Sequence, residues 1–408
     1  MKRVLYGEEG VSRMDSRTRY EYFRDADCTR CGECLAGCQY IDFSAGEAKA
    51  EMERLIAGKP SRKLIKHCTS CYACNAFCPN DCKPYELITG NWFKRYERKG
   101  LPVRASYLMP SSFPNFRTDV VKRMPTHEQQ LLEKWRDTPP EGELVLYPGC
   151  NVLTLPHLVD AGFMEGVTIA GQWELCCGEM FFRMGLFDAV ERTAERLTAY
   201  YRGRDIGTML FVCPACLNMF RNVLPSQFGA EFGFQTEYLG TYLLDKLQSG
   251  ALEPVKQMRG SVAVHDSCHA RILGDEIMGT SRELLTALGL QIKEMEHSRE
   301  TGFCCGAAAG CNRYSPFDIV FKAMRELWEA QKTGARDLAL YCTGCQVTLT
   351  LCRWLFPTLQ PVRHSLEYLK EATGEGKRHP AQARTFYMML NILTKAFPKM
   401  LSPRHYRV

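Results

Sequence analysis

The sequence has 408 residues, of which 45% are hydrophobic and 24% are charged, and its 52 basic and 46 acidic side chains give a net charge of +6. This length provides for about two to four domains with hydrophobic cores, and the balanced charge excludes a polyelectrolyte or a disordered chain. The longest uncharged stretch, residues 144–159, contains two prolines, so we expect no transmembrane helix. The first residues lack the apolar core of a signal peptide, and we therefore expect a cytoplasmic protein.

The cysteine content is the most informative part of the composition. There are 21 cysteines, which is an odd number, and most of them lie in C-x2-C groups. Sulfur atoms at this spacing can point at one centre, whereas an oxidising compartment would pair so many thiols at random. The pattern therefore favours metal thiolates in a reducing cytoplasm over disulfides.

The first metal motif occurs twice near the start of the chain. The spacing C-x2-C-x2-C-x3-C is shared by two runs, Cys28, Cys31, Cys34 and Cys38, and Cys68, Cys71, Cys74 and Cys78. It is the pattern of bacterial two-cluster ferredoxins, in which three close thiolates hold one cluster and the fourth reaches the other cluster. The pattern predicts two cubane [4Fe–4S] clusters, one on Cys28, Cys31, Cys34 and Cys78 and one on Cys38, Cys68, Cys71 and Cys74. Zinc, the alternative, takes its ligands as two pairs.

The 29 residues between the two runs are too many for a compact ferredoxin. Ser44 and Glu47 form a capping-box pattern before residues 48–56, which favour a helix. Gly58 and Pro60 then end that helix. The segment resembles the α-helical ferredoxin domain of the iron–sulfur subunits of succinate dehydrogenases.

The rest of the chain contains a duplication with five cysteines in each copy. Each copy has a lone cysteine, a Cys-Cys-Gly triplet and a C-x2-C pair; the first has Cys150, Cys176, Cys177, Cys213 and Cys216, and the second has Cys268, Cys304, Cys305, Cys342 and Cys345. The triplets and pairs recur after 128 and 129 residues, which is the period of a duplicated domain. The copies differ between the lone cysteine and the triplet, where the first has 25 residues and the second has 35.

Strands and helices are expected to alternate in both copies. β-rich runs at residues 209–212 and 338–341 end at the C-x2-C pairs, and a helical stripe over residues 186–201 precedes the first of them. This alternation predicts an α/β fold with a doubly wound parallel sheet in each copy. The cysteines then lie at the carboxyl ends of the strands, where such sheets carry their ligands.

The expected domains follow from these motifs and from the six prolines that interrupt the stretch after the second cysteine run. They are an α-helical ferredoxin domain over residues 1–95, a connector over 96–142 that wraps another surface, a first repeat domain over 143–255, a second over 256–372, and a basic amphipathic tail over 373–408.

Five cysteines per copy exceed the four terminal sites of a cube. Either one cysteine in each copy is idle, or a thiolate bridges irons in an opened cluster, and zinc is again the alternative. The arrangement resembles the CCG family of the heterodisulfide reductases, found in their B-type and D-type subunits, and the D-type also joins a two-cluster ferredoxin domain to two CCG domains. The resemblance covers nearly the whole chain. It implies two noncubane [4Fe–4S] clusters, held by all ten cysteines of the duplication, and a disulfide-binding crevice between them.

Two functions are open at this point. In the first, the ten cysteines form the catalytic site of a heterodisulfide-reductase-like oxidoreductase subunit, which cleaves a disulfide substrate with electrons from the ferredoxin domain. In the second, the four clusters form an electron relay between a flavin-containing or hydrogenase-type partner and a quinone, a cytochrome or another reductase. The complete sets of five cysteines favour the first function. Because the sequence has no dinucleotide-binding or phosphate-binding fingerprint, any flavin or nicotinamide is expected on a partner subunit.

A few further residues are candidates without a ligand role. Cys82, Cys311 and Cys352 are expected as buried thiols, with a place in the crevice as the alternative for Cys311. His265 and His269 flank a lone cysteine, and they either donate a proton to a leaving thiolate or hydrogen-bond to cluster sulfur or backbone.

The C-terminal segment carries the net charge of the chain. Residues 376–408 contain seven Lys or Arg and no acidic residue, around an apolar run at residues 386–393. A basic apolar helix docks on a partner subunit or makes peripheral contact with an anionic membrane, and we expect the partner. No motif supports binding of nucleic acid.

Overall fold

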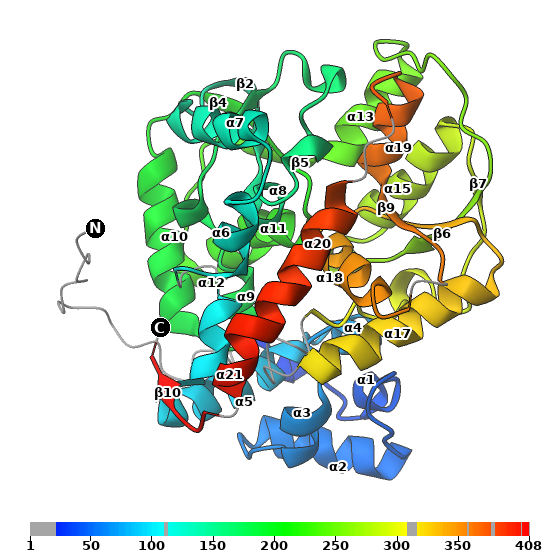
Figure 1. Cartoon of the computed structure of the whole chain (residues 1–408). Coiled ribbons are helices and arrows are strands. Elements are labelled where there is room, and N and C mark those ends of the chain that lie inside the picture. Colours follow the sequence, from blue (N-terminus) through cyan, green and yellow to red (C-terminus); the bar gives the residue numbers. More distant parts are fainter. Residues whose placement is uncertain are drawn as a thin grey trace.

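The computed structural model describes residues 22–109, 113–307, 316–356, 359–376, 380–400 and 402–407. Two parallel sheets with helices on their faces make up most of the molecule, and a region of helices and loops, blue in Figure 1, lies against one end of them. The mixed helix and sheet architecture expected from the sequence is confirmed.

The N-terminal region is built from helices. Within the described residues it contains α1 (Glu33–Ala36), α2 (Ala45–Ile56), α3 (Arg62–His67), α4 (Ala73–Ala76) and α5 (Tyr85–Lys99). The expected capping box starts α2: the Ser44 hydroxyl accepts from the Glu47 N–H at 3.3 Å, and the Ser44 N–H donates to the Glu47 carboxylate at 2.9 Å. Met52 and Leu55 on this helix are buried. The helix predicted between the two cysteine runs is therefore confirmed.

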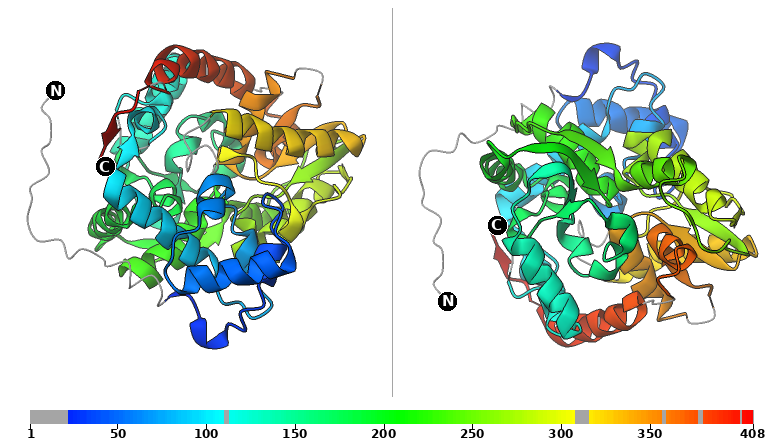
Figure 2. Two further views of the ribbon diagram at one scale, coloured as in Figure 1. Left: turned by 90° about the horizontal axis from the view of Figure 1, so that it is seen from below. Right: turned by 90° about the horizontal axis from the view of Figure 1, so that it is seen from above.

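The connector and the C-terminal segment lie together (Figure 2). β1 (Leu101–Pro102) pairs with β10 (His405–Tyr406) in a two-stranded antiparallel ladder. α6 (Phe116–Val121) and α7 (Thr126–Asp137) follow β1, and α6 packs against α20 (Pro380–Asn391). The two segments that flank the duplication in the sequence therefore hold each other in the structure.

The described part of the basic tail packs on the chain's own surface. Arg384 of α20 is buried, pairs with the Glu128 carboxylate of α7 and donates to the Thr154 carbonyl oxygen at 3.1 Å. Met388 is buried on the same helix, whereas Leu393 just beyond it is 55% exposed. The amphipathic segment expected to meet a partner is thus partly covered by the chain itself.

Both sheets have four parallel strands in equivalent order. The first, β3-β2-β4-β5, consists of β2 (Gly142–Tyr147), β3 (Thr168–Ile169), β4 (Ile206–Phe211) and β5 (Gln235–Tyr238). The second, β7-β6-β8-β9, consists of β6 (Ser261–His265), β7 (Gln291–Ile292), β8 (Asp337–Leu340) and β9 (Val362–His364). The expected parallel sheets are confirmed, although β4 and β8 end one residue earlier than the sequence predicts. Val212 and Tyr341 already turn the chain toward the helices that follow.

Helices cover both sheets and join them. The longer ones are α10 (Phe187–Tyr201), α13 (Leu239–Gln248), α15 (Asp275–Ala287), α17 (Pro316–Lys332), α18 (Thr343–Arg353) and α19 (Ser365–Ala372). α13 of the first unit packs against α15 of the second. Leu146, Leu210 and Leu338 of the central strands are fully buried, and burying each contributes about 1.5–3 kcal/mol. Among the described helices, none is long and apolar enough to cross a membrane.

Candidate metal centres

Four cysteines of the N-terminal region line one cavity. They are Cys28, Cys31, Cys34 and Cys78. Burial and repulsion from the other three sulfurs raise the pKa of Cys34 to about 12. The loop turns at Gly32 in the left-handed region (φ +82°), where a Cβ would lie only 2.5 Å from the Lys49 backbone nitrogen. Because only glycine fits there, the loop approaches α2 closely and holds its sulfurs around the cavity.

The other four cysteines of the two runs form a neighbouring group. They are Cys38, Cys68, Cys71 and Cys74. Burial raises the pKa of Cys74 well above its usual value, and the sulfurs of Cys68 and Cys34 raise it further. Burial and the Cys71 sulfur raise the pKa of Cys38. The fourth cysteine of each run therefore lies with the first three of the other run.

Cys82 lies beside the first group. Its backbone N–H donates to Cys78 Sγ at 3.3 Å, and its side chain is 1% exposed in the wall of the same cavity. It is a buried thiol, as expected.

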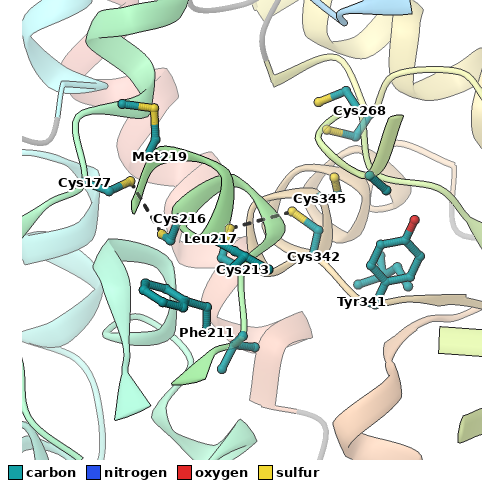
Figure 3. Close-up of a cluster of buried hydrophobic side chains, with 14 of the residues drawn as sticks. Cys177, Phe211, Cys213, Cys216, Leu217, Met219, Cys268, Tyr341, Cys342 and Cys345 are labelled. Carbon is teal, nitrogen blue, oxygen red and sulfur yellow. Dashed lines mark hydrogen bonds between the residues drawn. The ribbon is translucent and has the colours of Figure 1, made fainter. Parts of the chain in front are cut away.

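The five cysteines of the first repeat converge at the carboxyl end of its sheet. Cys150 follows β2, Cys176 and Cys177 follow β3, and Cys213 and Cys216 stand at the start of α11 (Pro214–Asn218) after β4. The sulfurs of Cys177 and Cys216 are 3.5 Å apart (Figure 3). The Cys150 side chain lowers the pKa of Cys176 and the Cys177 side chain raises it, so Cys176 interacts with both. All five thiols therefore belong to one group.

The second repeat forms the equivalent group. Cys268 follows β6, Cys304 and Cys305 follow β7 and a short 3-10 turn, and Cys342 and Cys345 stand at the start of α18 after β8. Hydrogen bonds from Cys304 and Cys345 hold the pKa of Cys305 well below its usual range, although it is buried. At Gly306 (φ +92°) a Cβ would lie 2.5 Å from the Ile319 carbonyl oxygen, so the triplet requires its glycine.

The unequal gaps between lone cysteine and triplet do not separate these groups. In the second repeat the longer gap contains α14 (Ala270–Leu273) and α15, whereas the shorter gap of the first contains 3-10 turns. In both repeats the lone cysteine still interacts with the first cysteine of the triplet: Cys176 raises the pKa of Cys150, and Cys304 raises the pKa of Cys268. Of the extra length, α15 belongs to the crossover to the edge strand, whereas α14 stays near the sulfurs and carries Arg271.

The groups of the two repeats face each other. Cys213 Sγ and Cys342 Sγ lie 4.0 Å apart (Figure 3). Each of these residues is the N-cap of the helix that follows a central strand. The two sulfurs differ in charge state: the side chains of Cys216 and Cys342 hold the pKa of Cys213 well below its usual value, whereas Cys213 raises the pKa of Cys342.

The second repeat also contacts the N-terminal region. Arg271, which is buried on α14, donates to the Cys71 carbonyl oxygen at 2.8 Å. The Tyr40 hydroxyl accepts from the Cys304 N–H at 2.6 Å. The four groups of thiols therefore form a series: the Cys28 group, the Cys71 group, the second repeat and the first repeat.

A buried arginine of the first repeat supports the second. Arg183 donates to Cys268 Sγ at 3.1 Å and to the Ser70 carbonyl oxygen. It also pairs with Glu179, which lies 2.9 Å from Nε2 of His269. Burial alone would raise the pKa of Glu179, but Arg183 and His269 hold it at about 2. Glu179 is therefore ionised and keeps the positive charge in place beside the thiols.

These thiols fit iron–sulfur clusters. Burial raises the pKa of most of them, so as free groups they stay protonated, whereas a coordinated metal ion deprotonates a thiol outright. The described surroundings supply only a few positive charges, chiefly Arg183 and Arg271. So many converging thiolates need a cationic centre of their own, and iron supplies it.

Comparison with known proteins finds similarity in both repeats. Residues 157–221 and 262–350 match the family model of the cysteine-rich domain CCG. Both repeats therefore contain a segment that matches this domain. The chain is 24% identical over 399 residues to the D-type subunit of the dihydromethanophenazine:CoB–CoM heterodisulfide reductase of Methanosarcina barkeri, a match that covers 85% of this chain and 93% of that protein. The chain is thus a homologue of the D-type subunits of heterodisulfide reductases.

Two other relatives match over shorter stretches. The chain is 35% identical over 200 residues to the probable iron–sulfur-binding oxidoreductase FadF of Bacillus subtilis, covering 45% of this chain and 25% of that protein. It is 30% identical over 184 residues to the EtfAB:quinone oxidoreductase of Syntrophomonas wolfei, covering 42% of this chain and 24% of that protein. The chain is an iron–sulfur oxidoreductase subunit related to these proteins and to the heterodisulfide reductases.

Sequence reasoning missed the polar residues around the sulfurs. Arg183, Arg271 and Tyr40 belong to no motif, and nothing in their spacing indicates that they meet cysteines. His269 is engaged at both ring nitrogens, by Glu179 and Asn218, which places it in the hydrogen-bonding network.

Two expected buried thiols have different outcomes. Cys352 is buried, as expected. Cys311 lies outside the described residues.

Proposed function

We propose that the chain is a subunit in which the two CCG domains reduce a disulfide-type substrate with electrons from the N-terminal domain. One disulfide, two electrons and two protons give two thiols. The observation that carries this proposal is the 4.0 Å contact of Cys213 with Cys342, which brings two five-thiol groups face to face. A relay needs no such arrangement, since an ordinary four-cysteine cube transfers electrons well.

The ligand sets in this proposal are those that the spacing predicts. The N-terminal cysteines hold two cubane [4Fe–4S] clusters in the crossed sets given above, and the ten CCG cysteines hold two noncubane clusters. When bound, these clusters supply one-electron storage and an iron that accepts a substrate sulfur. The chain's own groups position the thiolates: Arg183 keeps a positive charge beside Cys268, and Glu179 fixes that arginine.

The order of the thiol groups supports a one-electron route. Arg271 links the backbone at Cys71 to the second CCG domain, and Tyr40 links the same region to Cys304. From there the Cys342–Cys213 contact leads to the first CCG domain. Electrons entering at the Cys28 group would therefore reach both CCG sites in sequence.

A cavity of about 360 Å³ supports a substrate role. It is lined by residues of the connector, of both repeats and of α20, among them His157, Lys370 and Arg384. Its volume lies within the range of roughly 300–1,000 Å³ that small-molecule sites occupy. Behind it, His364 lies near both His157 and Cys213, and burial lowers its pKa to about 4. We assign the substrate entrance to this cavity.

The test uses anaerobically purified protein. It is oxidised with a panel of biological disulfides and one thiol while low-temperature EPR spectra are recorded. We expect a new substrate-dependent paramagnetic signal that is lost in Cys305→Ser and kept in Cys82→Ser, together with turnover by reduced viologen.

An electron relay is the second candidate. The similarity to the EtfAB:quinone oxidoreductase favours it, because that protein's name describes electron transfer to a quinone. If no disulfide changes the spectrum or is turned over, while electrons still pass to a partner subunit, the relay function is correct.

We further propose that a flavin-containing or other redox partner docks on the neighbouring helices α17, α18 and α20. α18 packs against both of the others, and together they expose Phe317, Phe321, Trp328, Trp354, Phe386 and Leu390. Phe321→Asp should release the subunit from its complex on a native gel. Val255→Asp, at an equally exposed apolar residue outside this surface, is the control. Binding of the purified chain to anionic vesicles that is lost in Phe321→Asp would instead indicate peripheral membrane contact.

A further inference from the structure

The end of strand β6 places a histidine among the thiols of the second CCG domain. His265 is the last residue of β6 and is 1% exposed. One of its ring nitrogens and the sulfurs of Cys305 and Cys345 all lie within 4.8 Å of one another. A four-coordinate metal with bonds of about 2.0 Å to nitrogen and 2.3 Å to sulfur has ligand atoms roughly 3.5 Å apart. The three side chains are therefore close enough to share one metal centre.

A carboxylate fixes the orientation of this ring. Nδ1 of His265 lies 2.7 Å from Oε1 of Glu326 on α17, and both side chains are buried. A carboxylate beside Nδ1 favours the tautomer in which Nδ1 carries the proton, and a metal that binds the ring then takes the lone pair of Nε2. Nε2 is buried and has no hydrogen-bond partner among the described residues. Histidines that bind metals typically donate their other N–H to a carboxylate in this way.

The first CCG domain has no equivalent of this nitrogen. Tyr147 is the last residue of β2, as His265 is of β6, and each pairs with the last residue of the neighbouring central strand. The Tyr147 hydroxyl donates to the Leu175 carbonyl oxygen, although its ring also lies near Cys177. The same position in the fold therefore carries a phenol committed to the backbone in one domain and a free imidazole nitrogen in the other.

We propose that His265 coordinates iron through Nε2 at the second CCG site, with Glu326 as the residue that positions it. The second site then has five thiolates and one imidazole, whereas the first has thiolates only. This inference rests on the proposed iron–sulfur ligand sets and not on the identity of the substrate. It makes the two faces of the disulfide-reducing centre chemically different.

The experiment is pulsed EPR on full-length protein grown with 15N-labelled or unlabelled histidine. The signal of the second CCG site, identified by its loss in Cys305→Ser, should show one strongly coupled histidine nitrogen, as in Rieske-type centres. The coupling should change with the isotope and disappear in His265→Cys. This variant offers a thiolate in place of the nitrogen, so it should keep its iron while its reduction potential falls, because an anionic ligand replaces a neutral one.

Two further variants, Tyr147→His and Glu326→Gln, are measured in the same experiment. Glu326→Gln should keep the iron and alter the nitrogen coupling, because a neutral amide replaces the carboxylate beside Nδ1 of His265. Tyr147→His, at the equivalent position of the first domain and without a supporting carboxylate, should leave the second site's spectrum unchanged. A wild type with full iron content and only a weakly coupled nitrogen overturns the inference and indicates an N–H···S hydrogen bond. Missing iron in the wild type would instead refute the ligand sets themselves.

Discussion

The two CCG domains are built on one plan but stabilised differently. Both have the strand order edge, centre, centre, edge, and both place five thiols at the carboxyl ends of equivalent strands. The chain between the lone cysteine and the triplet differs in length and in secondary structure, yet the sulfurs meet in the same pattern. The sheet determines where the thiols lie, whereas the length and secondary structure of the crossover can differ.

The residues at the carboxyl end of the first central strand show where the domains diverge. In the second domain His265 and Asp266 follow one another, and both are buried among charged partners. In the first domain the equivalent pair is Tyr147 and Pro148, which hold the turn with a ring and a fixed φ of −71°. Charged side chains stabilise this turn in the second domain, whereas restricted backbone freedom stabilises it in the first. Four changes test how the two domains are stabilised.

The largest effect is expected at the triplets. Cys177→Ser and Cys305→Ser occupy equivalent positions, and each should remove about four irons from an expected total of about sixteen, because each breaks one ligand set. Iron and sulfide analysis of anaerobically purified protein measures this. Cys82→Ser should keep all the iron. If one triplet variant lost both CCG clusters, the two sites would be a single unit joined through the Cys213–Cys342 contact.

Arg183→Ala should be the most destabilising change outside the ligands. It leaves the mostly buried Glu179 carboxylate with His269 as its remaining partner, and removing one partner of a buried pair costs up to about 3–5 kcal/mol. Denaturant unfolding, followed by absorbance of the clusters, measures the loss. Arg202→Ala, at an exposed position on the same domain, should stay within about 0.5 kcal/mol of the parent. Equal losses for both variants would show that the bridge between the domains contributes nothing.

Local patterns predicted much of this molecule. The capping box at Ser44 acts within four residues and was visible in the sequence, and the duplicated spacing of the cysteines indicated the paired sheets. Contacts between distant segments were not visible. Arg183 and Ser70 are 113 residues apart, and Arg384 and Glu128 are 256 apart.

Such contacts depend on how folded units dock. A pattern of apolar and polar residues along one helix specifies which face is buried, but not which partner buries it. The tail illustrates this: its charge and apolar run predicted docking on a partner subunit, whereas Arg384 is buried against the chain's own α7.

The third change tests the electrostatic loop. Asp266 accepts from Arg282 at 2.8 and 2.9 Å and from the Tyr341 hydroxyl at 2.9 Å. Asp266→Asn keeps the shape but loses the charge, and hydrogen bonds to charged groups contribute about 1.5–3 kcal/mol. Burial alone would raise the pKa of Asp266, but Arg282 holds it below its usual value.

The sign of the pH effect follows from that lowered pKa. The stability that Asp266 contributes is fully present above the pKa of about 3.9 that an unfolded Asp has, and it is lost as the pH falls below that value toward the folded pKa. The parent should therefore lose stability more steeply than Asp266→Asn as the pH is lowered from about 5 to 3. Parallel curves for the two proteins would contradict the ion pair's role.

The smallest effect is expected at the matching position of the first domain. Pro148 restricts the unfolded chain and packs so close to Gly171 that a Cβ there would lie 2.7 Å from the proline ring. Pro148→Ala should cost about 0.4–1 kcal/mol, mainly through the greater freedom of the unfolded state, with unchanged iron content and no dependence on pH. Denaturant midpoints at two pH values measure this. If Pro148→Ala cost as much as Asp266→Asn, the first loop would depend on packing against Gly171 rather than on chain entropy. Pro148→Val, which keeps some bulk but frees the backbone, would then recover most of the loss.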